Sequence, residues 1–217
     1  YMSMVDATTY EQGNMHLRPE KSSKLDFSYN FRSSKVQIFA DAYMNYTTDY
    51  ISQITKISDG LLITTYINGT SDLKTGADLS FKLVPAKWMS ATLSANTFYV
   101  NTKGNFEGAD IDNRGVSNNS NILLDFLPGK STDIHLQYFL TTPQYYPQLT
   151  TALTHYMNVG VKQKFLKGAM SVSVLLTDVF NTYKWQVESR NKWQVESRNS
   201  IFELTNISTR KSRMLWL

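Results

Sequence analysis

The chain has 217 residues, of which 41% are hydrophobic and 18% charged, with no cysteine, a formal net charge of +4 and a mean hydropathy of -0.33. No apolar run reaches the roughly 18 residues of a membrane helix, which excludes a helical membrane protein. A transmembrane β-barrel is not excluded, because alternating side chains keep every window average low. Basic residues are scattered apart from Arg210, Lys211 and Arg213, so no nucleic-acid partner is expected.

The ends of the chain differ from those of a complete secreted protein. It begins at Tyr1 without a start methionine or a signal peptide, and it stops at Leu217 inside an apolar run. Residues 1 to 21 are polar and irregular. We expect residues 1–217 to form a single region that is a piece of a longer chain.

The first predicted strand runs from about Ser22 to Arg32. Its odd positions are apolar and its even positions are polar, which is the period-two pattern of a strand with two different faces. The apolar face consists of Leu25, Phe27, Tyr29 and Phe31. A tight turn at Ser33–Ser34 would pair Phe31 with Val36 and Tyr29 with Ile38.

A long hairpin follows, from Lys35 to Val84, folded about Asp59–Gly60. An Asp-Gly pair between limbs rich in Tyr, Thr, Ile and Val is a strong hairpin signal, and a two-residue turn fixes the register of the limbs. That register places apolar residues opposite one another over most of the hairpin. The predicted pairs are Ala42 with Ala77, Ala40 with Leu79, Ile38 with Phe81, and Val36 with Leu83.

Further strands alternate with tight corners and longer segments. Trp88 to about Lys103 is predicted as a strand, Gly104 to Gly115 as a polar loop, and Ser117 to Leu127 as a strand. A three-residue corner at Pro128 to Lys130 would pair Leu124 with Ile134 and Ile122 with Leu136. After a loop that holds Tyr145 and Tyr146, a strand ending at Phe165 turns at Lys167–Gly168, which places Phe165 opposite Met170.

Strand length selects the fold class. Strands of a soluble β-sandwich usually have 3–10 residues, whereas Lys35 to Ser58 is long enough to cross a membrane and continue beyond it. Tight turns at one end and longer loops at the other match an outer-membrane barrel. We therefore predict an all-β, antiparallel transmembrane β-barrel segment of about nine long strands. Residues predicted to face lipid are Leu79, Phe81, Leu93, Val159 and Val172, and those predicted to face inward are Asp78, Ser94 and Lys162.

One short repeat stands out. The eight residues from Lys184 to Asn191 recur unchanged from Lys192 to Asn199. An even-numbered repeat would lengthen a hairpin without exchanging its faces. A real duplication and a sequencing or cloning artefact are both open interpretations.

Four stretches resemble motifs of one family. Residues 13–20 (GNMHLRPE) resemble GNxxLxPE, and Asn68-Gly69 followed by residues 76–78 resembles N-x-G…GxE. Residues 83–88 resemble a periplasmic turn, and residues 177–182 (TDVFNT) resemble DxFNT near a C-terminus. In their order and spacing these stretches are similar to the C-terminal part of the barrel of TonB-dependent outer-membrane receptors, within the Bacteroidetes-type outer membrane protein β-barrel family.

The resemblance implies a location, a function and partners. It implies a bacterial outer-membrane receptor for energised uptake of a scarce nutrient such as a siderophore or an oligosaccharide. Implied partners are outer-membrane lipid, the remaining N-terminal strands of an about 22-stranded barrel, a plug domain, a TonB-type inner-membrane complex and a surface lipoprotein. The chain departs from the pattern in having Asp78 for Glu and in carrying no plug domain or TonB box. A non-transporting structural or adhesive outer-membrane sheet is the alternative.

The sequence offers no catalytic, cofactor-binding or metal-binding residues, so we expect no enzyme and no cofactor. His135 alternates with Asp133 and Gln137, which a solvated inner face explains better than an acid–base pair. Asp178 is expected to stabilise either the inward-facing wall or a bend through backbone hydrogen bonds, with a functional site as the alternative. Ligand-binding residues are not assigned. Aromatic residues near the loop end are expected to form an interfacial girdle, with ligand stacking as the alternative, and Trp88 would belong to the opposite girdle; the loop-end set is Tyr145, Tyr146, Tyr183, Trp185 and Trp193.

Overall fold

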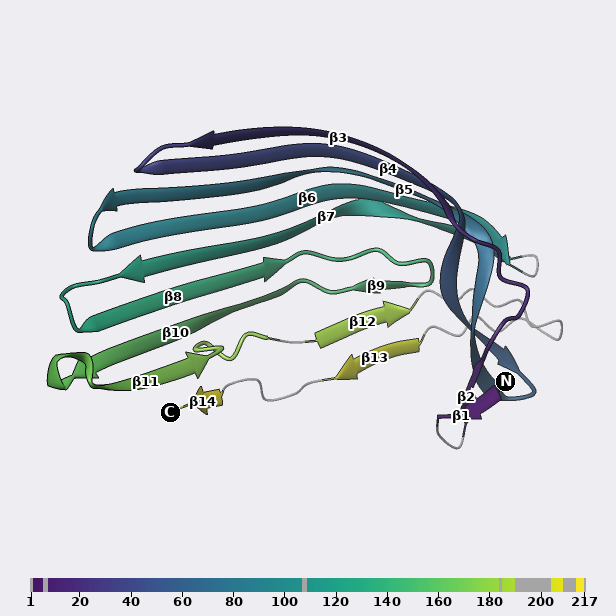
Figure 1. Cartoon of the computed structure of the whole chain (residues 1–217). Helices are drawn as coiled ribbons and strands as arrows, with labels where there is room; N and C mark the ends of the chain where they lie inside the picture. Colours follow the sequence, from purple (N-terminus) through teal and green to yellow (C-terminus); the bar gives the residue numbers. More distant parts are fainter. Residues whose placement is uncertain are drawn as a thin grey trace.

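The computed structural model describes residues 2–5, 8–106, 109–183, 185–189, 204–208 and 214–216. Most of these residues lie in antiparallel strands of one large curved sheet (Figure 1). No helix in the described part of the chain is long and apolar enough to cross a membrane. The predicted all-β class is confirmed.

In the described part of the chain, eight long strands build the sheet, and each pairs with the next long strand in sequence (Figure 1). The short strand β9 lies between β8 and β10 in the sequence, but β8 and β10 pair directly with each other. The long strands are β3 (Lys21–Arg32), β4 (Val36–Ser58), β5 (Leu61–Ala86), β6 (Met89–Phe106), β7 (Ala109–Phe126), β8 (Thr132–Thr141), β10 (Thr154–Phe165) and β11 (Met170–Thr177). The short strands are β1 (Met2–Met4), β2 (Thr9–Gln12), β9 (Leu149–Thr151), β12 (Trp185–Ser189), β13 (Leu204–Ser208) and β14 (Met214–Trp216).

The β4–β5 hairpin has the predicted turn and register. Asp59 and Gly60 have φ of 52° and 79°, the left-handed values that a two-residue hairpin turn of this kind requires. The four predicted pairs, from Ala42–Ala77 to Val36–Leu83, are present. The turn and the side-chain pattern therefore specify the same register.

Two irregularities interrupt this hairpin and cancel each other. Between Thr47 and Tyr50 the strand β4 carries one residue more than β5 does, and Asp49 adopts a φ of 52° there. Between Tyr50 and Ser52 the extra residue lies instead on β5, at Asn68-Gly69. One bulge on each strand restores the register beyond them.

Two tight turns are centred one residue later in the chain than predicted. Phe31 pairs with Ile38 instead of Val36, because the Ser33 N–H donates to the Val36 carbonyl at 2.7 Å and moves the corner to Ser34–Lys35. Leu124 likewise pairs with Leu136 instead of Ile134. Both shifts are even, so every apolar residue keeps its predicted face. The pair Phe165–Met170 is as predicted.

The predicted polar loop from Gly104 to Gly115 is wrong. β6 continues to Phe106 and β7 starts at Ala109, with Gly104 paired to Ile111. Outside the apolar belt both faces of a strand meet polar surroundings, so the alternation that marks a strand fades from the sequence. The ladder nevertheless continues, because it is held by backbone hydrogen bonds.

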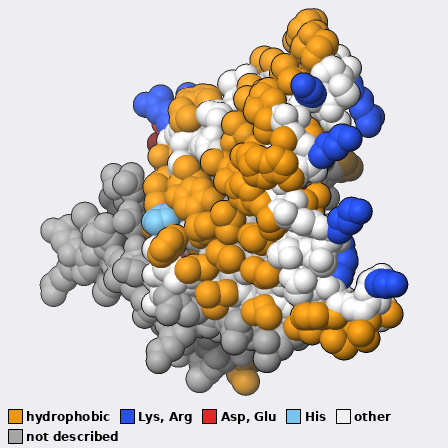
Figure 2. Space-filling model, turned by 90° about the vertical axis from the view of Figure 1, so that its left-hand side faces the viewer, with side chains coloured by type: hydrophobic (Ala, Val, Ile, Leu, Met, Phe, Trp, Pro, Cys, Tyr) orange, Lys and Arg blue, Asp and Glu red, His pale blue; other side chains and the backbone are white. Residues whose placement is uncertain are grey.

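The sheet presents an apolar outer face and a polar inner face. Residues paired across neighbouring strands share a face, so each row can be followed from strand to strand. One outer row consists of Ile38, Phe81, Leu93, Ile122, Tyr138 and Met157, and the adjacent inner row consists of Gln37, Lys82, Thr92, Leu123, Gln137 and Asn158. The predicted outward and inward residues lie on the predicted faces. Figure 2 shows hydrophobic side chains gathered in one continuous area of the surface.

A small core lies on the inner face at the loop end. There β4 and β5 bend away from the rest of the sheet (Figure 1), and Ile54, Ile67 and Ile111 are buried together. The Thr55 N–H donates to Gln148 Oε1 at 2.7 Å, which joins the bent hairpin to the segment between β8 and β10. The inner face is thus apolar where it is covered and polar elsewhere.

The described strands leave an open edge. Within the part of the chain that the structure describes, β3 pairs with β4 alone, and all of its residues are exposed. Large apolar side chains such as Phe27, 76% exposed, stand on this strand. A membrane-embedded edge needs backbone partners, so β3 is the edge at which a further strand would pair. Of the octapeptide repeat, residues 184 and 190–199 lie outside the described residues.

The lipid-facing assignment of adjacent residues on β5 is testable in the complete protein. Leu79→Arg should lower the free energy of unfolding by about 2–4 kcal/mol, because an arginine on the outer face must enter hydrocarbon. Ser80→Arg is the matched control and should cost much less, since its side chain lies on the polar inner face. The measurement is a denaturant titration of folding in lipid vesicles. Equal costs would contradict the assignment.

Candidate functional site

The two glycine-containing motif stretches meet in space at the loop end. Asn68 accepts a hydrogen bond from the Arg18 N–H at 2.7 Å, and its amide donates to the Arg18 carbonyl at 2.8 Å and to the Asp49 carbonyl at 2.7 Å. A single side chain thereby joins the segment before β3 to both bulges of the β4–β5 hairpin. Arg18 and Asn68 are 50 residues apart in the sequence but are in direct contact in the fold.

Neighbouring residues of the same segment complete this cluster. Asn14 donates to the Tyr66 carbonyl at 2.9 Å, and Glu20 accepts from the Ile51 N–H at 2.7 Å. Arg18 also forms an exposed ion pair with Asp49 at 2.6 Å. Because bulged residues leave ladder groups without strand partners, these side chains satisfy the backbone where the ladder is interrupted.

Tyr50 stands between the two bulges. Burial raises the pKa of its phenol above the usual value, and the nearby carboxylates of Asp72 and Glu20 raise it further. The Tyr50 carbonyl accepts from Thr70 Oγ1 at 3.0 Å.

Asp178 organises the chain after β11. It is 2% exposed and has a φ of 46°, and its carboxylate accepts from the N–H groups of Thr182 at 2.9 Å and Tyr183 at 3.1 Å. Its own N–H donates to Asn158 Oδ1 at 3.0 Å. The predicted bend-stabilising role is confirmed, since the carboxylate holds a tight turn of the backbone.

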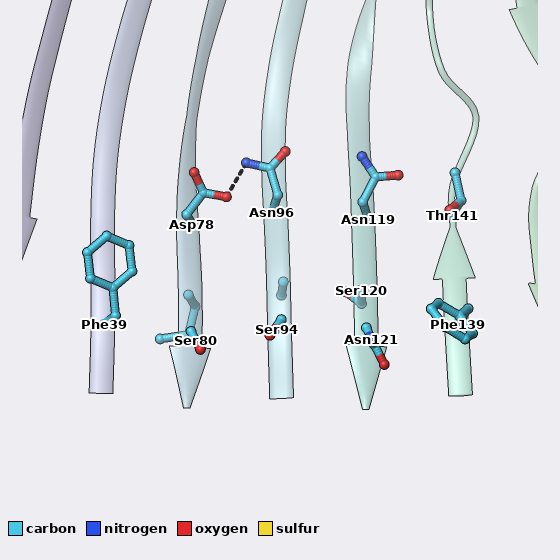
Figure 3. Close-up of a pocket in the computed structure, with 12 residues that line it drawn as sticks. Phe39, Asp78, Ser80, Ser94, Asn96, Asn119, Ser120, Asn121, Phe139 and Thr141 are labelled. Atoms are coloured by element: carbon cyan, nitrogen blue, oxygen red, sulfur yellow. Dashed lines mark hydrogen bonds between the residues drawn. The ribbon is translucent and has the colours of Figure 1, made fainter. Parts of the chain in front are cut away.

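A shallow hollow of about 420 Å³ lies on the inner face, in the middle of the sheet (Figure 3). Two neighbouring rows of inward side chains form it. One row contains Asp78, Asn96, Asn119 and Thr141, and the other contains Phe39, Ser80, Ser94, Asn121 and Phe139. In the second row small polar residues separate two phenylalanines, so the hollow has a hydroxyl and amide floor between aromatic walls.

Hydrogen bonds fix the polar side of the hollow. Asn96 Nδ2 donates to Asp78 Oδ1 at 2.6 Å (Figure 3) and to the Tyr43 hydroxyl at 3.0 Å. By contrast, Asn121 Oδ1 is buried without a hydrogen-bond partner. A buried amide oxygen of this kind is suited to accept a hydrogen bond from a further group.

Among the described residues, His135 on the inner face is not part of a serine–histidine relay. His135 Nδ1 lies 2.6 Å from Asp125 Oδ1, and Ser90 donates to the other oxygen of the same carboxylate at 3.0 Å. The serine thus contacts the carboxylate and not the imidazole that would have to act as its base. Asp133 pairs instead with Lys164, at 3.1 Å. In the described residues no His, Asp and Glu side chains cluster as metal ligands would.

Two of the loop-end aromatics lie on the inner face, so the girdle interpretation is wrong for them. Tyr145 covers Gly115, where a Cβ atom would collide with its ring. Tyr183 contacts Tyr156 edge-on with 5.4 Å between ring centroids, and Tyr156 stacks on Phe139 at 4.7 Å. Tyr146 is half exposed, the side chain of Trp185 is not described, and Trp193 lies outside the described residues. Trp88 is exposed and lies in the turn between β5 and β6, where a strand starting at Trp88 was predicted; its place in the opposite girdle stays a prediction.

The sequence analysis did not predict the two phenylalanines that form the walls of the hollow. Phe39 occupies an inward position of a strand whose other inward residues near it are Gln37 and Asp41. Phe139 likewise stands in the inner row of β8. An aromatic residue out of phase with the alternation is the signal that could have found them.

Comparison with known proteins agrees with this architecture. The model of the outer membrane protein beta-barrel family matches residues 1–209. The chain belongs to that family. An outer-membrane β-barrel is located in the bacterial outer membrane, so the apolar outer face contacts lipid. No curated protein and no solved structure matches the chain.

The hydrogen bonds of Asn68 should matter more than the ion pair beside them. Asn68→Ala removes three bonds at the bulges and should destabilise the complete barrel by about 1–3 kcal/mol. Arg18→Gln removes only the exposed ion pair with Asp49 and should cost less than about 1 kcal/mol. Unfolding titrations in vesicles, with hydrogen exchange of residues 13–20, give both numbers. A larger effect from Arg18→Gln would refute the role assigned to Asn68.

Proposed function

We propose that this chain forms part of the wall of an energised outer-membrane receptor that takes up a scarce nutrient, such as a siderophore or an oligosaccharide. The observation that carries the proposal is the cluster around Asn68. It unites the two stretches, residues 13–20 and 68–69, that resemble motifs of TonB-dependent receptors. A structural sheet has no evident need for a hydrogen-bonded joint of this construction at its loop end.

The inner face supports the proposal as well. The hollow combines an aspartate, amides and hydroxyls with the rings of Phe39 and Phe139. Aromatic faces and hydroxyl-binding amides are groups that bind hydroxyl-rich molecules. In a closed barrel this surface would face a ligand in transit or a plug domain.

The proposed receptor requires parts beyond this chain. Further N-terminal strands would pair with β3, and a plug domain would fill the lumen. A TonB-type inner-membrane complex would supply energy, and a surface lipoprotein is a further partner. We propose that the chain itself catalyses no reaction, in keeping with the contact between Ser90 and Asp125 that leaves His135 without a nucleophile.

Uptake in cells tests the transport proposal. A strain lacking the complete gene should lose most of its uptake of one ligand in a panel of labelled ferric siderophores, oligosaccharides and vitamins. A protonophore should abolish the same uptake in the parent strain, because the proposed transport is energised. Unchanged uptake and unchanged cell binding of every ligand would overturn transport and favour a structural or adhesive protein.

Filling the hollow gives a second test in the complemented strain. Ser94→Phe should reduce uptake of that ligand at least about tenfold, because the new ring occupies the floor between Phe39 and Phe139. Leu93→Phe is the matched control, since Leu93 lies opposite Phe81 in the outward row, away from the hollow, and should leave uptake unchanged. Surface amounts of both variants are compared by heat-modifiable mobility on gels. Equal uptake by the two variants would remove the hollow from the transport path.

A further inference from the structure

The turns that join β3 to β4, β5 to β6, β7 to β8 and β10 to β11 share a feature that the receptor proposal does not use. Each turn carries one lysine, at positions Lys35, Lys87, Lys130 and Lys167, and each of these lysines is exposed. None of the four turns contains an aspartate or a glutamate. The two-residue turn Asp59–Gly60, which joins β4 to β5 at the opposite end of the sheet, contains an aspartate and no lysine.

The topology brings these lysines to one end of the sheet. The turns β3–β4, β5–β6, β7–β8 and β10–β11 all lie on the same side in Figure 1. Figure 2 looks onto that end, and Lys and Arg side chains follow one another there along the border of the hydrophobic area. Because consecutive hairpins are adjacent in the sheet, the lysines form a row that we call the lysine rim.

The charges of the rim have no internal partners. The ammonium groups of these four lysines make no ion pair or hydrogen bond within the described residues, although the backbone carbonyl of Lys35 accepts a hydrogen bond from the Val84 N–H. The nearby Lys164 differs, because it faces inward and pairs with Asp133 at 3.1 Å. The rim therefore presents four unneutralised ammonium groups at the end of the barrel.

Exposed apolar side chains accompany these charges. Trp88 follows Lys87, Leu166 precedes Lys167, and Leu127 lies in the turn of Lys130, with exposures of 54%, 75% and 41%. The outer rows of apolar residues continue directly from these turns toward the middle of the strands. A lysine next to a membrane-facing tryptophan or leucine lies at headgroup depth, where its stem covers apolar surface and its ammonium reaches the polar layer.

We propose that the lysine rim binds the phosphate groups of anionic phospholipids in the leaflet at the turn end. Short turns of outer-membrane barrels are periplasmic, so this is the inner leaflet. Clustered lysines at a bilayer surface attract anionic headgroups. A lipid fits better than an acidic protein, because the charges border the lipid-facing rows on several hairpins and do not converge on one patch. The proposal rests on the barrel and its orientation, and not on transport.

Lipid selectivity of the complete protein measures this contact. The barrel is reconstituted in phosphatidylcholine vesicles, and spin-labelled phosphatidylglycerol and phosphatidylcholine report how many lipids of each type are immobilised at its perimeter. We expect the wild type to prefer phosphatidylglycerol by about fivefold at a rim site, as one lysine–phosphate contact predicts. The preference should fall as salt is raised.

Two sets of substitutions decide the assignment. Lys35→Gln, Lys87→Gln, Lys130→Gln and Lys167→Gln together should bring the preference close to one. The matched control removes the same charge near the loop end, through Lys21→Gln, Lys24→Gln, Lys103→Gln and Arg114→Gln, and should retain it. Heat-modifiable mobility verifies that both variants are folded. The proposal is overturned if the wild type shows no preference, if the rim variant keeps it, or if the control loses it equally.

Discussion

The alternation of side chains between lipid and lumen is the constraint on which the rest of the structure depends. In a membrane each backbone group must find a partner in the ladder, and each side chain on one face must tolerate hydrocarbon. A register shift by one residue would exchange the two faces of a strand, whereas a shift by two leaves them unchanged. Even the two opposing bulges of the β4–β5 hairpin obey this rule, because together they leave no net displacement.

This constraint explains which parts of the fold could be predicted. The β4–β5 pairing follows from Asp59–Gly60, since a two-residue turn leaves one register that places Ala40 opposite Leu79. The corners near Ser33 and Pro128 were misplaced by an even number, because side-chain pattern distinguishes faces but not neighbouring pairs of the same face. The strands between Gly104 and Gly115 were missed, because outside lipid no alternation is demanded.

The candidate site was less accessible from sequence. Nothing in a linear motif states that Asn68 bonds to the backbone of Arg18, since the contact depends on a bulge that the pattern does not announce. The inner position of Tyr145 depends on Gly115, whose missing side chain leaves room for the ring. Phe39 and Phe139 become neighbours of one hollow only through the lateral order of five strands. Long-range placement of this kind follows from topology and not from local preference.

The paired bulges also divide the β4–β5 hairpin into two parts that can change separately. Between the bulges and the β5–β6 turn the hairpin carries the lipid-facing rows, while beyond the bulges its tip is joined to Gln148 by the hydrogen bond from the Thr55 N–H. Because the joint at Asn68 and Asp49 absorbs its own offset, a tip of another length or composition could be grafted there without disturbing the wall.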